Sequence, residues 1–461
     1  MNKTIKLIWD AIRGTEKDFT SGSINRAIVL LSIPMILEMV MESTFAVVDI
    51  YFVGKIGENA INTVGLTESV LMLVYSLAIG LAMGATAMIS RRIGEKKPEE
   101  AANVAVQAIM LSATIAIIVG ALGFYFAEDI LRMMGASDEM ISSGIGYTKI
   151  IFATNIVIML IFLLNGVFRG AGDASIAMRV LWLSNGLNII LDPIFIFGFG
   201  PIPAFGVEGA AIATTIGRGT GVLFQLYILF NGSSIIKISI RYFKVQLKVI
   251  WRLIDIGSGS FFQFFIGSAS WIFMTYIISN NFSEMVLSGY IISIRVIIFT
   301  ILPSWGIANA AATLVGQNLG AKQPERAEKS VWRSAFFNMI FMVTVSIIFF
   351  TNAEFIIGIF SNKPEVIQAG VQSLKIIIGG YLFFAYGMVL SQAFNGAGDT
   401  YTPTAINFVA FWMIQIPLAW YLVNQGYGPP GVYWSIFFSE SILALICIYV
   451  FRLGRWKKVE I

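Results

Sequence analysis

Twelve long apolar stretches constrain this chain more than any other feature of its sequence. Each is long enough to cross a lipid bilayer as a helix, which takes about 20 mainly apolar residues. The sequence therefore predicts an all-α integral membrane protein. The expected spans cover roughly residues 28–54, 60–89, 101–127, 144–168, 177–199, 206–230, 251–279, 285–313, 330–352, 368–394, 403–423 and 430–452.

Composition supports this reading and removes several classes of chemistry. Apolar residues make up 57% of the chain and charged residues 13%, which excludes a soluble multidomain enzyme, a disordered chain and a disulfide scaffold. The absence of histidine excludes His-based zinc sites and catalytic triads with a His base. The single cysteine, Cys447, cannot form an internal disulfide. The net charge of +4 is too small to imply nucleic acid.

The distribution of basic residues predicts an orientation. Residues 1–25 are polar and lack the apolar core of a signal peptide, so the first span is expected to remain as a helix. With twelve spans, 24 lysines and arginines fall on the side of both termini and five on the other. Because cytoplasmic loops are enriched in basic residues, both termini are expected in the cytoplasm, and the membrane is expected to be a prokaryotic cytoplasmic (inner) membrane.

The sequence contains an internal repeat with an offset of 226 residues. Ile93-Gly-Glu-Lys-Lys-Pro-Glu-Glu-Ala recurs as Leu319-Gly-Ala-Lys-Gln-Pro-Glu-Arg-Ala, and Phe168-Arg-Gly-Ala-Gly-Asp recurs as Phe394-Asn-Gly-Ala-Gly-Asp. Six spans per half give both halves the same orientation, so we expect two six-helix lobes related by a pseudo-two-fold axis along the membrane normal. The expected parts are a tail (1–27), an N-lobe (28–236), a cytoplasmic linker (237–250), a C-lobe (251–452) and a second tail (453–461).

Several motifs together resemble the multidrug and toxic compound extrusion (MATE) family. They are the two Gly-Ala-Gly-Asp motifs, Val48-Asp-Ile-Tyr-Phe-Val-Gly54, Asn188-Ile-Ile-Leu-Asp-Pro193 and Val315-Gly-Gln-Asn-Leu-Gly-Ala321. The resemblance covers about residues 25–450. It implies a multidrug efflux antiporter, not an enzyme, that exports small organic cations in exchange for inward H⁺ or Na⁺. It implies no cofactor besides the coupling ion, and the protein is expected to be a monomer.

Ionisable residues inside the bilayer are costly unless they are paired or hydrated, so each is a functional candidate. Asp49, Glu68, Asp192 and Thr214, from four spans, lie about 8–12 Å below the outer boundary at 1.5 Å per helical residue. Asn188 shares a helix face with Asp192. Such an all-oxygen set suits Na⁺, while adjacent carboxylates suit H⁺ carriage. For Asn188 and Thr214, ordinary hydrogen bonding between helices is the competing interpretation.

The resemblance assigns a cation site in the N-lobe to Asp49, Asn188, Asp192 and Thr214, but the sequence also departs from the family pattern. Phe45 replaces a Tyr that is frequent there, and Glu38 and Glu42 add carboxylates to the face that carries Asp49. These three residues, with Glu68, are candidates for the substrate cavity.

In the C-lobe, residues 258–279 of the seventh span and 370–394 of the tenth contain no carboxylate, whereas the NorM-like branch has acidic residues in these spans. The resemblance is therefore closer to the DinF-like branch, and ion coupling is expected in the N-lobe. Gln263 and Arg295 are the polar cavity candidates of the C-lobe, and Arg295 is equally interpreted as a structural ion pair or carbonyl cap. Arg218 is expected to neutralise Asp192 or Glu68.

Two other classes of function compete with efflux. A flippase for lipid-linked precursors would carry a phosphate and should place basic residues in the cavity, whereas the interior of the N-lobe is acidic. An intramembrane enzyme is disfavoured because no catalytic constellation lies at a plausible depth.

Overall fold

A computed structural model describes residues 3–14 and 18–461, so five residues of the expected N-terminal tail (1–2 and 15–17) lie outside it. Within the described chain the fold is helical, which confirms the predicted class. The first half contains α1 (Lys3–Arg13), α2 (Ile24–Gly54), α3 (Glu58–Gly94), α4 (Pro98–Tyr125), α5 (Ala127–Met133), α6 (Asp138–Ala153), α7 (Asn155–Ala171), α8 (Ala174–Phe197) and α9 (Val207–Asn231).

A short 3₁₀ helix, Ile240–Tyr242, lies between the halves. The second half contains α10 (Leu247–Asn281), α11 (Glu284–Gly320), α12 (Pro324–Thr351), α13 (Ala353–Gly358), α14 (Pro364–Ile378), α15 (Tyr381–Ala397), α16 (Tyr401–Asn407), a π-helical segment (Phe408–Gln415), α17 (Ile416–Asn424), α18 (Pro429–Arg452) and a 3₁₀ helix (Arg455–Lys458). We refer to α2–α9 as the N-lobe and to α10–α18 as the C-lobe.

The helices match the expected spans with two kinds of difference. Nine helices of the described chain are long and apolar enough to cross a membrane, and two bent pairs raise the number to eleven. The pairs are α6 with α7, bent by 46°, and α14 with α15, bent by 56°, where we predicted unbroken fourth and tenth spans. The expected sixth span is α9, a helix of 25 residues that is less apolar than the others.

The two halves have similar backbone structures at equivalent positions, as the repeated motifs predict. Helices α3 and α11 each have 37 residues, and α4 and α12 each have 28. Lys96 and Lys322 are the two non-glycine residues with positive φ, at 62° and 58°, in the described chain. Gly172 and Gly398 end α7 and α15 with φ of 87° in both. Because residues with a Cβ atom disfavour the left-handed region, this backbone conformation explains why glycine occurs at both positions.

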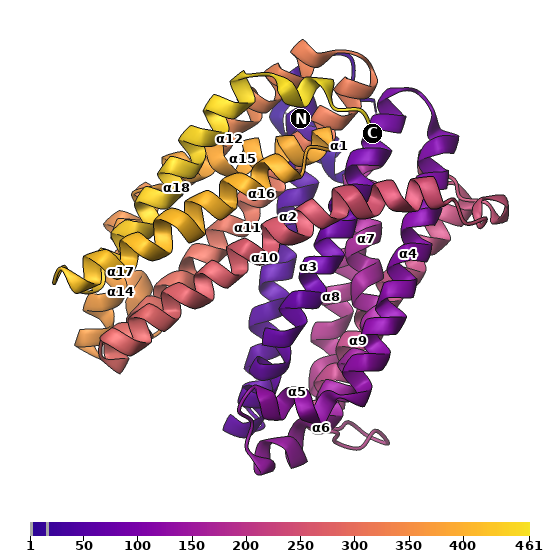
Figure 1. Cartoon of the computed structure of the whole chain (residues 1–461). Helices are drawn as coiled ribbons and strands as arrows, with labels where there is room; N and C mark the ends of the chain where they lie inside the picture. Colours follow the sequence, from indigo (N-terminus) through magenta and orange to yellow (C-terminus); the bar gives the residue numbers. More distant parts are fainter. Residues whose placement is uncertain (1–2, 15–17) are drawn as a thin grey trace.

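The two lobes pack against each other at the end of the molecule where the described termini lie (Figure 1). The contact is made mainly by α3 with α10 and by α11 with both α2 and α3. Small residues permit the approach: a Cβ added to Gly80 would lie 2.6 Å from the Gly257 carbonyl oxygen. Away from this contact the lobes diverge, so that α5 and α6 lie far from α14 and α17 (Figure 1).

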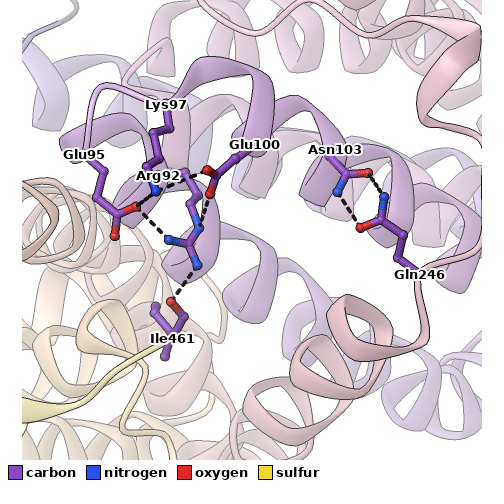
Figure 2. Close-up of polar contacts among 7 residues, drawn as sticks. All are labelled: Arg92, Glu95, Lys97, Glu100, Asn103, Gln246 and Ile461. Atoms are coloured by element: carbon purple, nitrogen blue, oxygen red, sulfur yellow. Dashed lines mark hydrogen bonds and ion pairs between the residues drawn. The ribbon is translucent and has the colours of Figure 1, made fainter.

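At the same end of the molecule, a polar network connects α3 to the C-terminal segment and to α15 (Figure 2). Arg92 of α3 forms ion pairs with Glu95 at 2.6 Å and Glu100 at 3.5 Å, and it donates a hydrogen bond to the Ile461 carbonyl at 2.9 Å. Arg91 donates to the carbonyls of Val459 and, in α15, Ala397. The C-terminal segment thus ties α3 of the N-lobe to the C-lobe.

The segment between the lobes is held against the N-lobe. The amides of Asn103, on α4, and Gln246 exchange two hydrogen bonds of 2.9 and 3.1 Å (Figure 2). Gln107, one turn further along α4, donates to the carbonyls of Tyr242 and Lys244. This segment therefore has fixed contacts on α4 although it carries little regular structure.

Candidate functional site

Helix α2 presents the acidic face that the sequence predicts. The Ser23 side chain caps its first turn by accepting a hydrogen bond from the Arg26 N–H. Pro34 lies inside the helix, where it removes one backbone hydrogen bond. Beyond it, the buried carboxylates of Glu38 and Asp49 and the partly buried one of Glu42 project from α2.

Asn188, Asp192 and Thr214 meet between α8 and α9, as their spacing predicts. The Asn188 amide group, oriented to satisfy both neighbours, donates to Asp192 Oδ2 at 3.0 Å. Its oxygen then accepts from the Thr214 backbone N–H at 3.0 Å and from the Thr214 hydroxyl at 3.2 Å. Asp192 is fully buried. The amide therefore links the carboxylate of α8 to the hydroxyl of α9.

A glycine allows α9 to approach α8 this closely. A Cβ added to Gly217 would lie 2.8 Å from the Ser184 carbonyl oxygen and 3.0 Å from the Asn188 Cβ. Because both contacts are tighter than ordinary packing distances, a larger residue at position 217 would push the helices apart. The separation that lets Asn188 reach Thr214 thus depends on this position.

Arg218 pairs with Glu42 and not, as we predicted, with Asp192 or Glu68. The Arg218 guanidinium lies 2.7 Å from Glu42 Oε1, and Asn185 of α8 donates to Glu42 Oε2 at 3.0 Å. The guanidinium also lies over the ring of Phe45, 4.9 Å from its centroid, at a distance typical of a cation–π contact. Phe45 therefore packs against the arginine and adds no hydrogen-bonding group.

Glu38 has the second arginine of the N-lobe interior as its partner. Arg169, from the first Gly-Ala-Gly-Asp motif at the end of α7, lies 3.5 Å from Glu38 Oε1. The other carboxylate oxygen, Oε2, is buried without a hydrogen-bond partner. Glu38 and Glu42 are thus each paired with one arginine. Of the three carboxylates on the acidic face of α2, Asp49 is the one without such a partner in the described chain.

Asp49 and Asp192 have no ion-pair partner among the described residues. The charge of Asp49 interacts with those of Glu68 and Arg218, and the charge of Asp192 interacts with that of Asp49. The Glu68 side chain is exposed, whereas Asp49 and Asp192 are buried. Two buried carboxylates whose charges interact and that have no ion-pair partner in the described chain form a group that can hold one positive charge.

The chemistry of this group suits a small hard cation held by mixed oxygen ligands. Carboxylate, amide and hydroxyl oxygens are available from Asp49, Asp192, Asn188 and Thr214. Within the described chain, no three Asp, Glu or Cys side chains are grouped closely enough to hold a metal ion on their own. A Na⁺ ion here would therefore depend on the amide and the hydroxyl, whereas a proton would need one carboxylate only.

The clearest cavity lies in the C-lobe, where sequence reasoning had placed Gln263 and Arg295. Gln263 lines it and accepts a hydrogen bond from Asn395 at 3.0 Å. Arg295 does not line it: its side chain is exposed on α11, without an ion pair in the described chain. Glu440, on α18, also lines the cavity, so the C-lobe carries a carboxylate in its twelfth span although the seventh and tenth provide none there. An acidic residue inside the twelfth apolar stretch was the missed signal.

The C-lobe retains a neutral version of the N-lobe contact. Ser439 donates to Gln415 Oε1 at 2.8 Å, and Gln415 donates to Ser270 at 3.2 Å. Ser439 is the counterpart of Thr214 at an offset of 225, which also relates Gly206-Val207 to Gly431-Val432. The hydroxyl–amide pair is therefore present in both lobes, and the Asp192 carboxylate is what distinguishes the N-lobe.

Comparison with known proteins gives one family. The MatE family model matches residues 34–194 and again 260–421. The two matches begin 226 residues apart, the offset of the internal repeat. Each lobe is thus matched separately by the same family model.

Individual relatives cover nearly the whole chain. A protein described as a probable multidrug resistance protein, NorM, from Thermotoga maritima is 28% identical over 94% of both chains. A multidrug resistance MATE transporter of the MOP superfamily, solved in an outward-facing conformation, has a TM-score of 0.89 with 26% identity and full coverage of both chains. A MOP superfamily transporter from Pyrococcus furiosus, whose binding pocket is described as having reverse polarity, also has a TM-score of 0.89, with 26% identity over 98% of both chains.

Proposed function

Because the chain belongs to the MatE family, we propose that it is a secondary active multidrug efflux antiporter. It exports organic cations across the membrane and takes up H⁺ or Na⁺ in exchange. The names of its relatives, which refer to multidrug resistance, support the substrate class. The site itself supports the exchange.

The observation that carries the proposal is the pair Asp49 and Asp192. Both carboxylates are buried, interact with each other and have no basic side chain bound to them in the described chain. Burying charge without a partner is expensive, and a cation from the medium removes that cost. Such a group is occupied by H⁺ or Na⁺ in one state and is free to attract a cationic substrate in another.

The way the lobes meet supports transport by alternating access. In the present structure the lobes are closed where the termini lie and diverge at the opposite end (Figure 1). With both termini in the cytoplasm, as the excess of basic residues predicts, this is an outward-facing state, and the likeness to the outward-facing MATE structure supports it. Opening the inner side requires α3 to separate from α10 and the bonds of Arg91 and Arg92 to the C-terminal segment to break.

The charge of the N-lobe interior favours cationic over phosphate-bearing cargo. Four carboxylates of this interior are buried or partly buried (Glu38, Glu42, Asp49 and Asp192). Its two arginines, Arg169 and Arg218, are paired with Glu38 and Glu42. A phosphate-bearing precursor needs free guanidinium or ammonium groups. Efflux of organic cations is therefore favoured over a flippase activity.

The test is transport of ethidium by inverted membrane vesicles with the two ion gradients imposed separately. Ethidium accumulation driven by a proton or a sodium gradient, and abolished when that gradient is collapsed, is the expected result. A vesicle preparation that contains the folded protein and accumulates no ethidium under either gradient contradicts the proposal. Vesicles without the protein provide the background.

A further inference from the structure

The C-lobe cavity that Gln263 lines has a volume of about 250 Å³. Its walls come from α10, α11, α15, α16, the π-helical segment and α18, and one side is completed by Ile79 and Met83 of α3, in the N-lobe. The volume lies near the low end of small-molecule sites, which span roughly 300–1,000 Å³. A cavity of this size accommodates one compact molecule.

Glu440 gives the cavity a negative charge that nothing else in it balances. It is the one charged residue among those that line the cavity, and no hydrogen bond or ion pair of its carboxylate is found in the described chain. A carboxylate within the apolar part of a membrane protein is costly unless a positive charge or water compensates it. The cavity is therefore electrostatically complementary to a cation.

Asn395 adds a fixed hydrogen-bond acceptor. Its Nδ2 donates to the Oε1 atoms of Gln263 and Gln392, both at 3.0 Å, and these two acceptors fix the orientation of the amide. Its Oδ1 is consequently the free end, buried and without a partner. Because buried acceptors are normally satisfied, this oxygen is available to an N–H donor in the cavity.

Aromatic rings supply flat walls. Phe264 and Trp305 stack with ring centroids 5.9 Å apart, and Trp271 and Phe411 line the same space. The faces of such rings attract cations as well as flat apolar surfaces. Flat aromatic walls, a carboxylate without a counter-charge and an unpaired acceptor together favour a flat cation that carries N–H donors.

We propose that this cavity is a second binding site, separate from Asp49 and Asp192, for a compact aromatic cation that carries N–H donors. The proposal rests on the function proposed above. Glu440 provides the counter-charge, Asn395 Oδ1 accepts a hydrogen bond from the ligand, and Trp305 with Phe264 covers its ring. Because Ile79 and Met83 form part of the wall, separation of α3 from α10 opens this site, so its affinity depends on how the lobes are arranged.

The experiment measures binding of proflavine, a flat fluorescent cation with two aromatic amines, to the purified full chain in lipid nanodiscs. Proflavine is expected to bind the wild type at two sites and Asp49→Asn at one. Glu440→Gln should weaken the remaining site of Asp49→Asn by about tenfold or more, as expected when a hydrogen-bonded charge is lost. Glu365→Gln, which removes an exposed carboxylate of the same lobe outside the cavity, is the matched control.

A second variant tests the location without a change of charge. A Cβ on Gly267, which lines the cavity, meets nothing nearer than Phe411 at 3.9 Å, so the backbone at this position has room for a side chain, and we expect Gly267→Leu to occupy part of the cavity. It should reduce proflavine binding as Glu440→Gln does. Unchanged binding in both variants, with ethidium efflux intact, overturns the second site and leaves the proposed function standing. Absent efflux by the wild type, with proflavine binding still lost in both variants, overturns the proposed function and supports the site.

Discussion

Arg218 is bound to Glu42 at 2.7 Å, so the single basic residue of α9 is committed to α2 and is not the counter-ion of Asp192. This relationship organises the N-lobe interior. It separates a structural pair, closed by Asn185 and covered by Phe45, from the two carboxylates that remain without a cation. On α2, Glu42 therefore has a structural role, whereas Asp49 is available to bind a cation.

We expect Glu42→Gln to destabilise the protein, because it leaves the Arg218 guanidinium buried without its counter-charge. Breaking a buried pair in this way costs roughly 3 kcal/mol, which should appear as a lowered midpoint of thermal unfolding in detergent. Replacing Arg218 as well, in Glu42→Gln/Arg218→Met, should recover much of the loss. A double variant no more stable than Glu42→Gln would show that the pair is not what the substitution disturbs.

We expect Asp49→Asn to fold normally and to lose ion-driven efflux of ethidium entirely. The amide keeps the shape of the side chain, but it can neither bind a proton at this position nor supply the negative charge that a cation needs. Asp129→Asn, at an exposed carboxylate of the same lobe, is the matched control and should transport like the wild type. Normal efflux by well-expressed Asp49→Asn would remove Asp49 from the mechanism.

The first membrane helix is expected to change its position with protonation. Pro34 interrupts its hydrogen bonds, and the Glu38–Glu42–Asp49 face lies beyond that point. Spin labels at Tyr51 and Phe199, two exposed positions, should report different distances at pH 5 and pH 8 in a variant without Cys447. Pro34→Ala should reduce the difference. Equal distances at both pH values in a transporting protein would count against the movement.

The C-terminal segment should detach from α12 as the pH falls. The hydrogen bond from Lys457, at 2.6 Å, holds the pKa of Glu328 below its ordinary value of 4.5. The pair therefore stabilises docking above pH 4.5, and the contribution is lost as the pH falls through the lowered pKa. Since neither side chain is deeply buried, we expect about a twofold change in the docking equilibrium. Fluorine NMR of fluorotryptophan at the buried Trp456 measures it, and Glu328→Gln should remove this pH dependence.

Local spacing predicted the contacts that a single helix or a pair of neighbouring helices determines. Asn188 and Asp192 are four residues apart and do interact, and the depth of Thr214 correctly placed it beside them. Arg218 was assigned to the wrong carboxylate because sequence supplies depth along a helix but not its rotation about its axis. Glu42 and Asp49 lie on the same helix about two turns apart, at about 5.4 Å per turn, so depth alone does not decide which carboxylate the Arg218 side chain reaches.

The bends in the fourth and tenth spans could not be predicted for a related reason. Hydropathy measures how apolar a stretch is, and the residues around Thr154 and Gly380 are as apolar as their surroundings. Where the helix breaks depends on packing against neighbouring helices. Glu440 differs, because the sequence itself shows an acidic residue within the apolar stretch 430–452, where an ionisable group is a functional candidate.

The last prediction concerns which lobe couples the ion, since the C-lobe cavity also contains a carboxylate, Glu440. The charge of Asp192 interacts with that of Asp49, and Asp192 is linked to an amide and a hydroxyl. Glu440, in contrast, lines an aromatic cavity with an amide oxygen. The first arrangement suits a small ion and the second suits an organic cation. Ion-driven counterflow should therefore be uncoupled by Asp192→Asn, while Glu440→Gln and Gln263→Ala should raise the half-saturating concentration of substrate and keep the dependence on the ion gradient. Coupling that survives in Asp192→Asn and disappears in Glu440→Gln would place the coupling ion in the C-lobe instead.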